Sequence, residues 1–458
     1  MRAFARQMIE RMKAVAAAGA VAAFWLAAWV FAAALVAQPL ILPGPGAVVV
    51  ALLRLVCDAG TWAILAGSGV RILGGLALAA VCGGLLAGIS SRSRAFARLV
   101  APALSFVKAT PVACVVVLLL IWLGSERVSI AAVFLMALPG VYFSLFEGLA
   151  QVDKPLEQMF RLHGVRGWRL FCAHTWREVL PFVLSCARAV IGMSWKAGVA
   201  AELIGMAVGT VGERIYQAKL LIETADLLAW TVLVVAASWA CERVLVWLLR
   251  VSGPVAWRAA VRAHGHGLRG RAGAASDGAA AELALAVGDR APWAPALDGL
   301  VLNVPAGGRI CVMGASGMGK STLLSLAAGE CVPCSMVFQD ARLVEDASAL
   351  DNVLVCADAR VDASSVAALL RLLVPGIDVY ARVAELSGGQ RRRVEIARAL
   401  LCPGDAVILD EPFTGLDTAA RDACAEVVLD LLDGRMLLLA THDVADAQAL
   451  DISDIITL

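Results

Sequence analysis

The chain has 458 residues, of which 60% are hydrophobic and 17% are charged, and its mean hydropathy is +0.80. A single soluble globule of this composition would expose too much apolar surface, and a fully disordered chain would be far less hydrophobic. The formal net charge of +1 gives no reason to expect binding to nucleic acid. The 12 cysteines are scattered along the chain, unlike the disulfide framework of a small secreted protein.

Long apolar stretches dominate residues 1–250. Six of them are long enough to cross a membrane: 15–37, 72–91, 109–125, 128–146, 179–206 and 227–249. Pro102, Pro111 and Pro139 interrupt some of these stretches, so the count could differ by one. We therefore expect residues 1–250 to form an all-α, six-helix transmembrane domain surrounded by membrane lipid.

The basic residues of the loops predict an orientation. With the N-terminus in the cytoplasm, most Lys and Arg residues of the loops fall inside, and only Arg54, Arg127, Arg214 and Lys219 fall outside. The first apolar run is too long for the core of a cleaved signal peptide. We expect a multi-pass protein of the cell membrane, with the N-terminus and everything after residue 250 in the cytoplasm.

The composition changes after residue 250. Residues 251–281 are rich in Ala, Gly and Arg without an apolar period, which is typical of a linker. His264 and His266 could contact a metal there, although two histidines without further ligands are more often solvated. Residues 282–458 alternate short β-branched runs with helical segments, which indicates an α/β domain with a mostly parallel sheet and its own core.

A glycine-rich segment in this second domain matches the phosphate-loop pattern G-x-x-x-x-G-K-[ST]. It follows the apolar run 310–313 and precedes a helical segment, which is the strand, turn and helix that the pattern requires. Its backbone N–H groups and the helix N-terminus would hold phosphate oxygens. Lys320 would reach the β- and γ-phosphates, and the Ser321 hydroxyl would bind Mg²⁺. The expected nucleotide-binding residues are Gly314, Ala315, Ser316, Gly317, Met318, Gly319, Lys320, Ser321 and Thr322.

Two carboxylates follow the apolar run 406–409. Asp410, at the end of the predicted strand, can hold Mg²⁺ through water, and Glu411 can polarise an attacking water molecule. Alone, such a pair is usually a solvated turn. Together with a phosphate loop it favours a catalytic site.

A second glycine-rich segment opens the predicted helix 391–401. Ser387, Gly388, Gly389 and Gln390 combine a hydroxyl, two glycines and a helix N-terminus, which suits another anion. One nucleotide does not need two such sites in one domain. We therefore expect this segment to face the nucleotide that another copy holds.

These motifs give residues 282–458 a specific resemblance to the nucleotide-binding domain of ATP-binding cassette (ABC) transporters. The phosphate loop, LSGGQ at 386–390, ILDEP at 408–412, TGLD at 414–417 and THD at 441–443 occur in the order of that family. The resemblance implies a P-loop NTPase fold that uses ATP and Mg²⁺. It implies that Gln339 contacts Mg²⁺ and links to the membrane domain, and that His442 contacts the γ-phosphate. The catalytic residues would be Glu411, His442 and Lys320, with Ser321, Gln339 and Asp410 around the metal.

The segment departs from the family pattern between Lys320 and Gln339. Only 19 positions separate these residues, where the family usually inserts a β-hairpin, so we expect a shortened β-subdomain. Trp293 is the only aromatic residue just upstream of the phosphate loop, and it would either stack on adenine or pack at a strand end. Cys331 and Cys334 form a CxxC pair without further ligands, which favours an ordinary loop over a redox or metal site.

The basic, amphipathic stretch 151–178 resembles the coupling loop of binding-protein-dependent importer permeases. Gly164, Trp168 and Phe171, and the sequence SWKAGVAAE at 194–202, resemble the nitrate/sulfonate/taurine group. The residues at 158–160, Gln-Met-Phe, stand where that family has Glu-Ala-Ala. The alternative is an ordinary basic cytoplasmic loop.

Several charged residues lie in or near the predicted spans: Arg71, Lys108, Arg188, Lys196 and Glu202. They would line an anion pathway, or they would extend to the membrane interfaces, with Glu202 paired to Lys196. Both interpretations stay open.

The two resemblances together imply ATP-driven import of a small solute. The expected cargo is an organic or inorganic anion of the nitrate/sulfonate/taurine class, delivered by an extracytoplasmic substrate-binding protein. An exporter half-transporter, an importer of a pyrimidine vitamin precursor and a membrane-bound regulatory ATPase are the alternatives, although exporter membrane domains are longer than 250 residues. One phosphate loop and one LSGGQ per chain predict a homodimer, with a related fused chain as the rival partner.

Overall fold

The computed structural model describes residues 2–263, 283–287, 294, 297–315, 317–331 and 334–458. It divides into two compact units, which are described separately. Unit 1 consists of Met1–Gln151 and Val179–Arg250, and unit 2 consists of Val152–Glu178 and Val251–Leu458. Segment 152–178 therefore belongs to the same compact unit as the predicted α/β domain.

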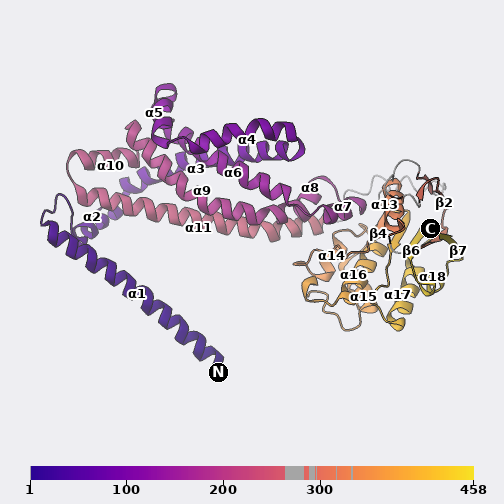
Figure 1. The fold of residues 1–458 in the computed structure, drawn as a ribbon. Coiled ribbons are helices and arrows are strands. Elements are labelled where there is room, and N and C mark those ends of the chain that lie inside the picture. Colours follow the sequence, from indigo (N-terminus) through magenta and orange to yellow (C-terminus); the bar gives the residue numbers. More distant parts are fainter. Residues whose placement is uncertain (1, 264–282, 288–293, 295–296, 316, 332–333) are drawn as a thin grey trace. The chain divides into compact units, whose positions relative to one another are not determined.

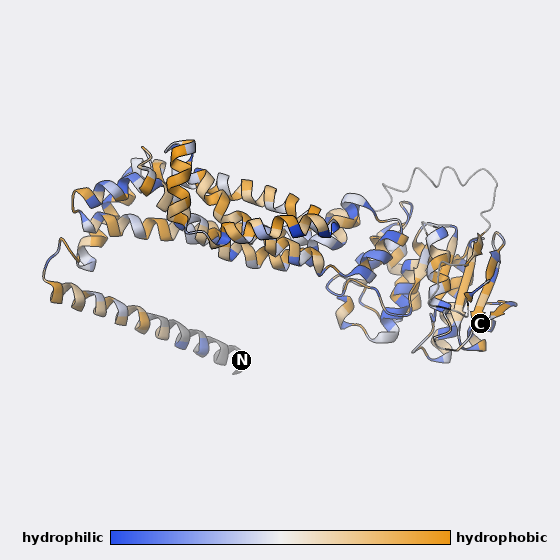
Figure 2. Cartoon of the chain, turned by 45° about the horizontal axis from the view of Figure 1, so that its top comes forward, coloured by the Kyte–Doolittle hydropathy of each residue, from blue (hydrophilic) through white to orange (hydrophobic). Residues whose placement is uncertain are grey.

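Within the described residues of unit 1, the regular elements are all helices. Its helices are α1 (Arg2–Val36), α2 (Pro45–Cys57), α3 (Ala59–Arg92), α4 (Arg94–Ala109), α5 (Val112–Leu123), α6 (Val128–Ala150) and α10 (Val211–Leu220), with most of α9 (Trp176–Gly205) and α11 (Thr224–Arg262) (Figure 1). Their surfaces are largely apolar, as expected for contact with lipid (Figure 2).

Five helices are long and apolar enough to cross a membrane, and a sixth span is possible if a bent pair counts as one. That pair is α4 and α5, which meet at an angle of 103°. The span expected at 109–125 is therefore only the 12-residue helix α5, which Thr110 and Pro111 separate from α4. The physical reason is that proline has no N–H to donate and disfavours a helical conformation in the preceding residue.

Helices α3 and α6 pack closely through small residues. The buried positions of α3 include Gly75, Ala79, Gly83 and Ala87, which follow one helical face. A Cβ atom added at Gly75 would lie 2.5 Å from the Ile130 carbonyl oxygen of α6. Glycine is needed there because membrane helices associate through close backbone contact.

The pairing of Glu202 with Lys196, which was part of one of the two open alternatives, does not occur. The fully buried Glu202 carboxylate accepts hydrogen bonds from Ser68 Oγ at 2.8 Å and from Arg71 Nε at 3.2 Å. Lys196 is exposed, as are Lys108 and Arg188. Glu202 follows Lys196 by six residues along α9, a spacing that does not place two side chains on the same helix face, and α3 supplies the partner instead.

Unit 2 is an α/β domain, as expected. Its strands are β1 (Leu283–Ala286), β2 (Val301–Val304), β3 (Arg309–Met313), β4 (Ser335–Val337), β5 (Ala406–Asp410), β6 (Met436–Thr441) and β7 (Asp454–Thr457). Its helices are α7 (Lys154–Leu162), α8 (Gly167–Leu170), α13 (Lys320–Glu330), α14 (Ala349–Leu354), α15 (Ala363–Leu373), α16 (Gly388–Leu401), α17 (Thr418–Leu431) and α18 (Val444–Ala449), with a π-helical turn at Phe171–Thr175 and a 3₁₀ turn at Val383–Glu385.

Five strands form a parallel sheet in the order β4-β5-β6-β3-β7, and β1 pairs with β2 in an antiparallel ribbon. Alternate residues of each central strand face opposite sides. Ile310 and Val312 pack with α13, whereas Cys311 packs with α15, α16 and α17. The loops after the parallel strands consequently meet at one edge of the sheet.

The start of the predicted linker is corrected. Residues 251–262 continue helix α11, and they have a buried face at Gly253, Trp257 and Ala260. This spacing of i, i+4 and i+7 is helical, but it is carried by one tryptophan and two small residues, which hides it from a search for large apolar side chains. The rest of the predicted linker, 264–281 with His264 and His266, lies outside the described residues.

Candidate nucleotide-binding and hydrolysis site

The phosphate loop joins β3 to α13. Gly317 and Gly319 have φ angles of +87° and +98°, which favour glycine because a side chain would be strained there. Gly314 is also restricted, since an added Cβ would lie 3.2 Å from the Leu458 carbonyl oxygen. Helix α13 then begins at Lys320, so its free N–H groups lie at the end of the loop. Ser316 lies outside the described residues.

Lys320 points back into the loop that precedes it. Its Nζ donates to the carbonyl oxygens of Gly314 at 2.6 Å and Ala315 at 3.2 Å. The same nitrogen lies 3.9 Å from Glu411 Oε1. The sequence-predicted phosphate-binding lysine and catalytic carboxylate are therefore neighbours, although 91 positions separate them in the chain.

Asp410 ends strand β5 and is buried beside α13. Burial raises the pKa of Asp410, while a hydrogen bond with Ser321 and the charge of Lys320 act in the opposite direction. Its Oδ1 atom is buried and has no hydrogen-bond partner. A buried carboxylate oxygen without a donor, next to a hydroxyl, is an arrangement that a divalent cation would satisfy.

Glu411 and His442 face each other from the ends of β5 and β6. His442 Nδ1 lies 2.8 Å from Glu411 Oε2. The hydrogen bond and charge of Glu411 raise the pKa of His442. Glu411 itself has a φ of +50°, a costly conformation for a residue with a side chain, which is found mostly where function requires it.

The segment LSGGQ forms the N-terminus of α16. Ser387 Oγ accepts from the Gln390 N–H, and Gln390 Oε1 accepts from the Ser387 N–H at 2.9 Å, which is a capping box. Ser387 and Gly388 are exposed. A Cβ at Gly389 would lie 3.4 Å from the Gly415 carbonyl oxygen, so this segment contacts the TGLD loop closely.

The structure thus brings together most of the predicted site. Lys320, Ser321, Asp410, Glu411 and His442 converge at the carboxyl edge of the sheet. Gln339 is exposed after β4, and Met318 and Thr322 belong to the loop and first turn of α13. Trp293, the candidate for adenine stacking, lies outside the described residues.

Comparisons with known proteins match both halves of the chain. Residues 80–255 match a family model described as "Binding-protein-dependent transport system inner membrane component", and residues 297–414 match one described as "ABC transporter". The aliphatic sulfonates import ATP-binding protein SsuB 1 of Paracoccus denitrificans is 35% identical over 179 residues, which cover 36% of this chain and 72% of that protein. The chain belongs to the ABC transporter family.

Two other members of the family show similar likeness. The taurine import ATP-binding protein TauB of Pseudomonas aeruginosa is 38% identical over 33% of this chain and 67% of that protein. The thiamine import ATP-binding protein ThiQ of Jannaschia sp. is 34% identical over 32% of this chain and 77% of that protein. A solved dimeric bacterial ABC transporter cassette, MJ0796, is 24% identical over 36% of this chain and 86% of that chain, with a TM-score of 0.32.

Membership in the ABC family has direct consequences. ATP is the nucleotide of this site, and the chain is an ATP hydrolase coupled to transport. The permease match and the apolar helices make it a multi-pass membrane protein. A binding-protein-dependent family also implies a substrate-binding protein as a partner.

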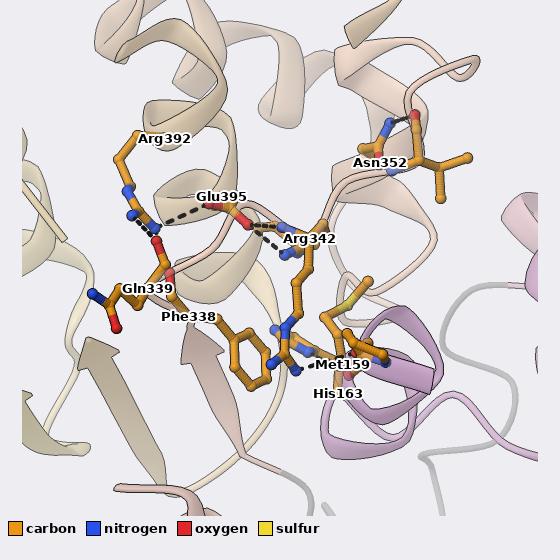
Figure 3. A network of polar contacts seen from close by, with 11 residues as sticks. Met159, His163, Phe338, Gln339, Arg342, Asn352, Arg392 and Glu395 are labelled. Carbon is orange, nitrogen blue, oxygen red and sulfur yellow. Dashed lines mark hydrogen bonds and ion pairs between the residues drawn. The ribbon is translucent and has the colours of Figure 1, made fainter. Parts of the chain in front are cut away.

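The ABC cassette contains a buried ionic network that the sequence analysis missed (Figure 3). Glu395 of α16 is fully buried and accepts from the Arg342 backbone N–H at 2.6 Å. It also pairs with Arg392 at 3.2 Å and Arg398 at 3.5 Å. Arg392 donates to the carbonyl oxygens of Phe338 and Gln339. The sequence signal was the run RRRVEIAR, in which Glu395 stands three residues from each of two arginines.

Segment 152–178, the predicted coupling loop, is part of the core of unit 2. Met159 and Phe160, at the degraded family triplet, are almost completely buried in the same core as β3 and α13. Arg342 Nη1 donates to the Pro155 carbonyl oxygen at 3.1 Å and to Gln158 Oε1 at 3.2 Å.

The short stretch after α13 also meets this segment. The Cys334 N–H donates to the Leu162 carbonyl oxygen at 3.1 Å. Cys331 and Cys334 are free thiols, and burial raises the pKa of Cys334 to about 12. Across the part of the chain that the structure describes, no group of three or more His, Cys, Asp or Glu side chains could hold a metal ion. Of the CxxC pair, Cys334 thus contacts segment 152–178 through its backbone N–H.

Proposed function

We propose that this chain is one half of an importer that uses ATP hydrolysis to move a small anion of the nitrate/sulfonate/taurine class across the cell membrane. A separate extracytoplasmic binding protein delivers the anion. The observation that carries this proposal is the combination, in one chain, of a binding-protein-dependent permease match with an ABC cassette whose core contains segment 152–178 of that permease match. The sulfonate and taurine import proteins among its relatives support the cargo class.

Each residue at the sheet edge has a role in this proposal. The loop N–H groups and Lys320 bind the phosphates, and Ser321, Asp410 and Gln339 would hold Mg²⁺, which neutralises phosphate charge when it is bound. Glu411 accepts a proton from the attacking water. His442 keeps the Glu411 carboxylate oriented and reaches the γ-phosphate, and Trp293 would cover the adenine.

The assembly that completes this site is a homodimer. The exposed Ser387 and Gly388 of one copy would bind the triphosphate that Lys320 of the second copy holds. The capping box supports this arrangement because it keeps the α16 N-terminus ordered and open to an incoming anion. We further propose residues 1–250 as the permease domain and 282–458 as the cassette, with the N-terminus and the cassette in the cytoplasm, where the positive-inside rule places them.

Uptake measurements test the import activity. The chain would be produced with its binding protein in cells that lack their own sulfonate importers, and the accumulation of radiolabelled taurine, ethanesulfonate and nitrate would be measured. We expect uptake of at least one of these anions by the wild type, and none by Glu411→Gln or without the binding protein. Uptake that does not need hydrolysis, or a fall in accumulation as expected for an exporter half, would reject the proposal.

A pyrimidine-containing vitamin or its precursor is the second candidate cargo. It is supported by the 34% identity to a thiamine import ATP-binding protein. Radiolabelled thiamine in the same uptake experiment distinguishes the two cargo classes, because only one of them should accumulate in a hydrolysis-dependent manner.

A further inference from the structure

Helix α11 does not stop where unit 1 ends. Its residues up to Arg250 belong to unit 1, and the same helix continues through Arg262 as part of unit 2. In this last part, Gly253, Trp257 and Ala260 are buried, whereas Val255 and Arg258 are exposed. A single helix face is therefore packed into the core of unit 2.

Trp257 anchors this helix end. Its side chain is 5% exposed, and its Nε1 donates to Asp351 Oδ2 of α14 at 3.1 Å. The guanidinium carbon of Arg177 lies 5.0 Å from the centre of the tryptophan ring, within the range of a cation–π interaction. Arg177 also lies 3.9 Å from Asp346. The indole is thus held from two sides.

The helix end also binds the start of α9. Trp176 Nε1 donates to Ser252 Oγ at 3.0 Å. Trp176 and Arg177 are the residues through which segment 152–178 leaves unit 2 and becomes a membrane helix. Two of the chain's connections between the units, at α9 and at α11, are therefore tied to each other inside unit 2.

The segment that contains Asp351 is also connected to the LSGGQ helix α16. Asp351 follows Ser348, which caps α14, and precedes Asn352, whose side chain bonds both backbone groups of Val344. Two residues earlier, the Arg342 backbone donates to Glu395 of the LSGGQ helix. The loop from Gln339 to α14 is thereby fastened to α16 at one end and to Trp257 at the other.

We infer that residues 251–262 are a second coupling element, in addition to segment 152–178, and that Trp257 is its positioning residue. Residues 251–262 belong to the same helix as the last part of unit 1, so a displacement of α14 during the ATP cycle would act on the end of α11 through Trp257. This inference rests on the proposed function, because coupling presupposes a transport cycle.

The test uses the full chain in lipid nanodiscs and needs no transported substrate. The ATPase kcat and KM are measured together with the rate at which a maleimide labels Cys57, an exposed thiol of unit 1, with and without ATP and vanadate. Mass spectrometry of the Cys57 peptide gives the rate. The variants are Trp257→Ala and Trp257→Phe, with Val255→Ala as the matched control, since Val255 is exposed on the same helix end.

We expect nucleotide to change the Cys57 labelling rate in the wild type and in Val255→Ala. In Trp257→Ala this change should shrink about 5-fold or more, while the KM for ATP stays within about 2-fold. Trp257→Phe keeps a ring for Arg177 but loses the N–H donor, so it should restore part of the response. If Trp257→Ala does not fold, Asp351→Ala removes the same hydrogen bond from the other side and should show the same loss.

The inference is overturned if nucleotide changes the labelling equally in the wild type and Trp257→Ala, or changes it in neither. It is also overturned if kcat, the affinity for ATP and the nucleotide-dependent change in labelling rate are all lost together in Trp257→Ala and Asp351→Ala. Such a loss would indicate a role in folding alone. If no anion is taken up but the labelling rate still responds to nucleotide through Trp257, the proposed cargo is rejected and the coupling element is not.

Discussion

His442 Nδ1 lies 2.9 Å from Glu411 Oε1 and 2.8 Å from Oε2, so one ring nitrogen contacts both oxygens of the carboxylate. Glu411 is mostly buried at its strained backbone position, whereas His442 is largely exposed. The pair therefore places a carboxylate beside Lys320 and leaves most of the imidazole exposed.

The first prediction concerns hydrolysis. Glu411→Gln should still bind ATP but should lower kcat about 100-fold or more, because the amide cannot accept a proton from water. Lys320→Ala should instead weaken ATP binding itself, since it removes a charge that contacts phosphate. Fluorescent ATP titration and steady-state ATPase rates measure both effects. A kcat near that of the wild type in Glu411→Gln would disprove the role of this residue.

The pKa of His442 should depend on Glu411. The carboxylate stabilises the imidazolium form, so the pKa of His442 lies above its ordinary value of 6.5 in the wild type. In Glu411→Gln the pKa should fall toward 6.5, and His442 will lose its proton at a lower pH. NMR titration of labelled histidine measures the shift. The same pKa in both proteins would show that the pair does not persist in solution.

The buried network around Glu395 should contribute strongly to stability. Glu395→Ala leaves Arg392 and Arg398 buried without their carboxylate, which typically costs about 3–5 kcal/mol. The control is Glu345→Ala, because Glu345 is 70% exposed and lies 3.7 Å from Arg391. An exposed pair of this kind should contribute less than about 1 kcal/mol. The denaturant midpoints of the two variants are compared, with the loss of ATP binding as the signal of unfolding. Equal midpoints would contradict the prediction.

His163 should make unit 2 sensitive to acid. It is fully buried, its Nδ1 lies 2.8 Å from the Met159 carbonyl oxygen, and burial lowers its pKa to about 3. The unfolded chain binds a proton at its ordinary pKa of 6.5, whereas the folded chain does not until about pH 3. The contribution of neutral His163 to the free energy of unfolding is therefore fully present above pH 6.5. Between pH 6.5 and about pH 3 the free energy of unfolding should fall by about 1.4 kcal/mol for each pH unit.

His163→Leu separates this effect from general acid denaturation. Leucine fills a similar apolar space and does not titrate, so the part of the pH slope due to His163 should disappear. Denaturant midpoints of the full chain at pH 5.5 and 7.5 provide the measurement. An unchanged slope in the variant would place the acid sensitivity elsewhere.

The proposed homodimer predicts complementation between two inactive copies. Lys320→Ala and Ser387→Arg, carried by differently tagged chains, should combine in a mixed dimer that has one site with both lesions and one intact site. Part of the ATPase activity should then return, relative to either variant alone. A monomeric chain, or a failure of the two tags to purify together, would rule the homodimer out.

The parts of the site whose chemistry is local could be predicted from the sequence. The phosphate loop, the Asp410–Glu411 pair and the capping box at Ser387 each need a few adjacent residues with particular backbone angles or donors, and such patterns can be recognised from their spacing. The apolar spans follow from the length of a membrane. The break at Pro111 was suggested by proline, but its angle of 103° depends on what α4 and α5 pack against.

The partners of buried charges that lie far apart in the sequence could not be predicted, because they depend on how the chain folds. Glu202 pairs with Arg71 and not with Lys196, which is nearer in the sequence, and Glu395 accepts a hydrogen bond from the backbone N–H of Arg342. The packing of the end of α11 likewise depends on distant residues, because Trp257 contacts Asp351 and Arg177 from other parts of the chain. Most buried charges and N–H groups have a hydrogen-bond partner, and the sequence does not show which residue from a distant part of the chain will supply it.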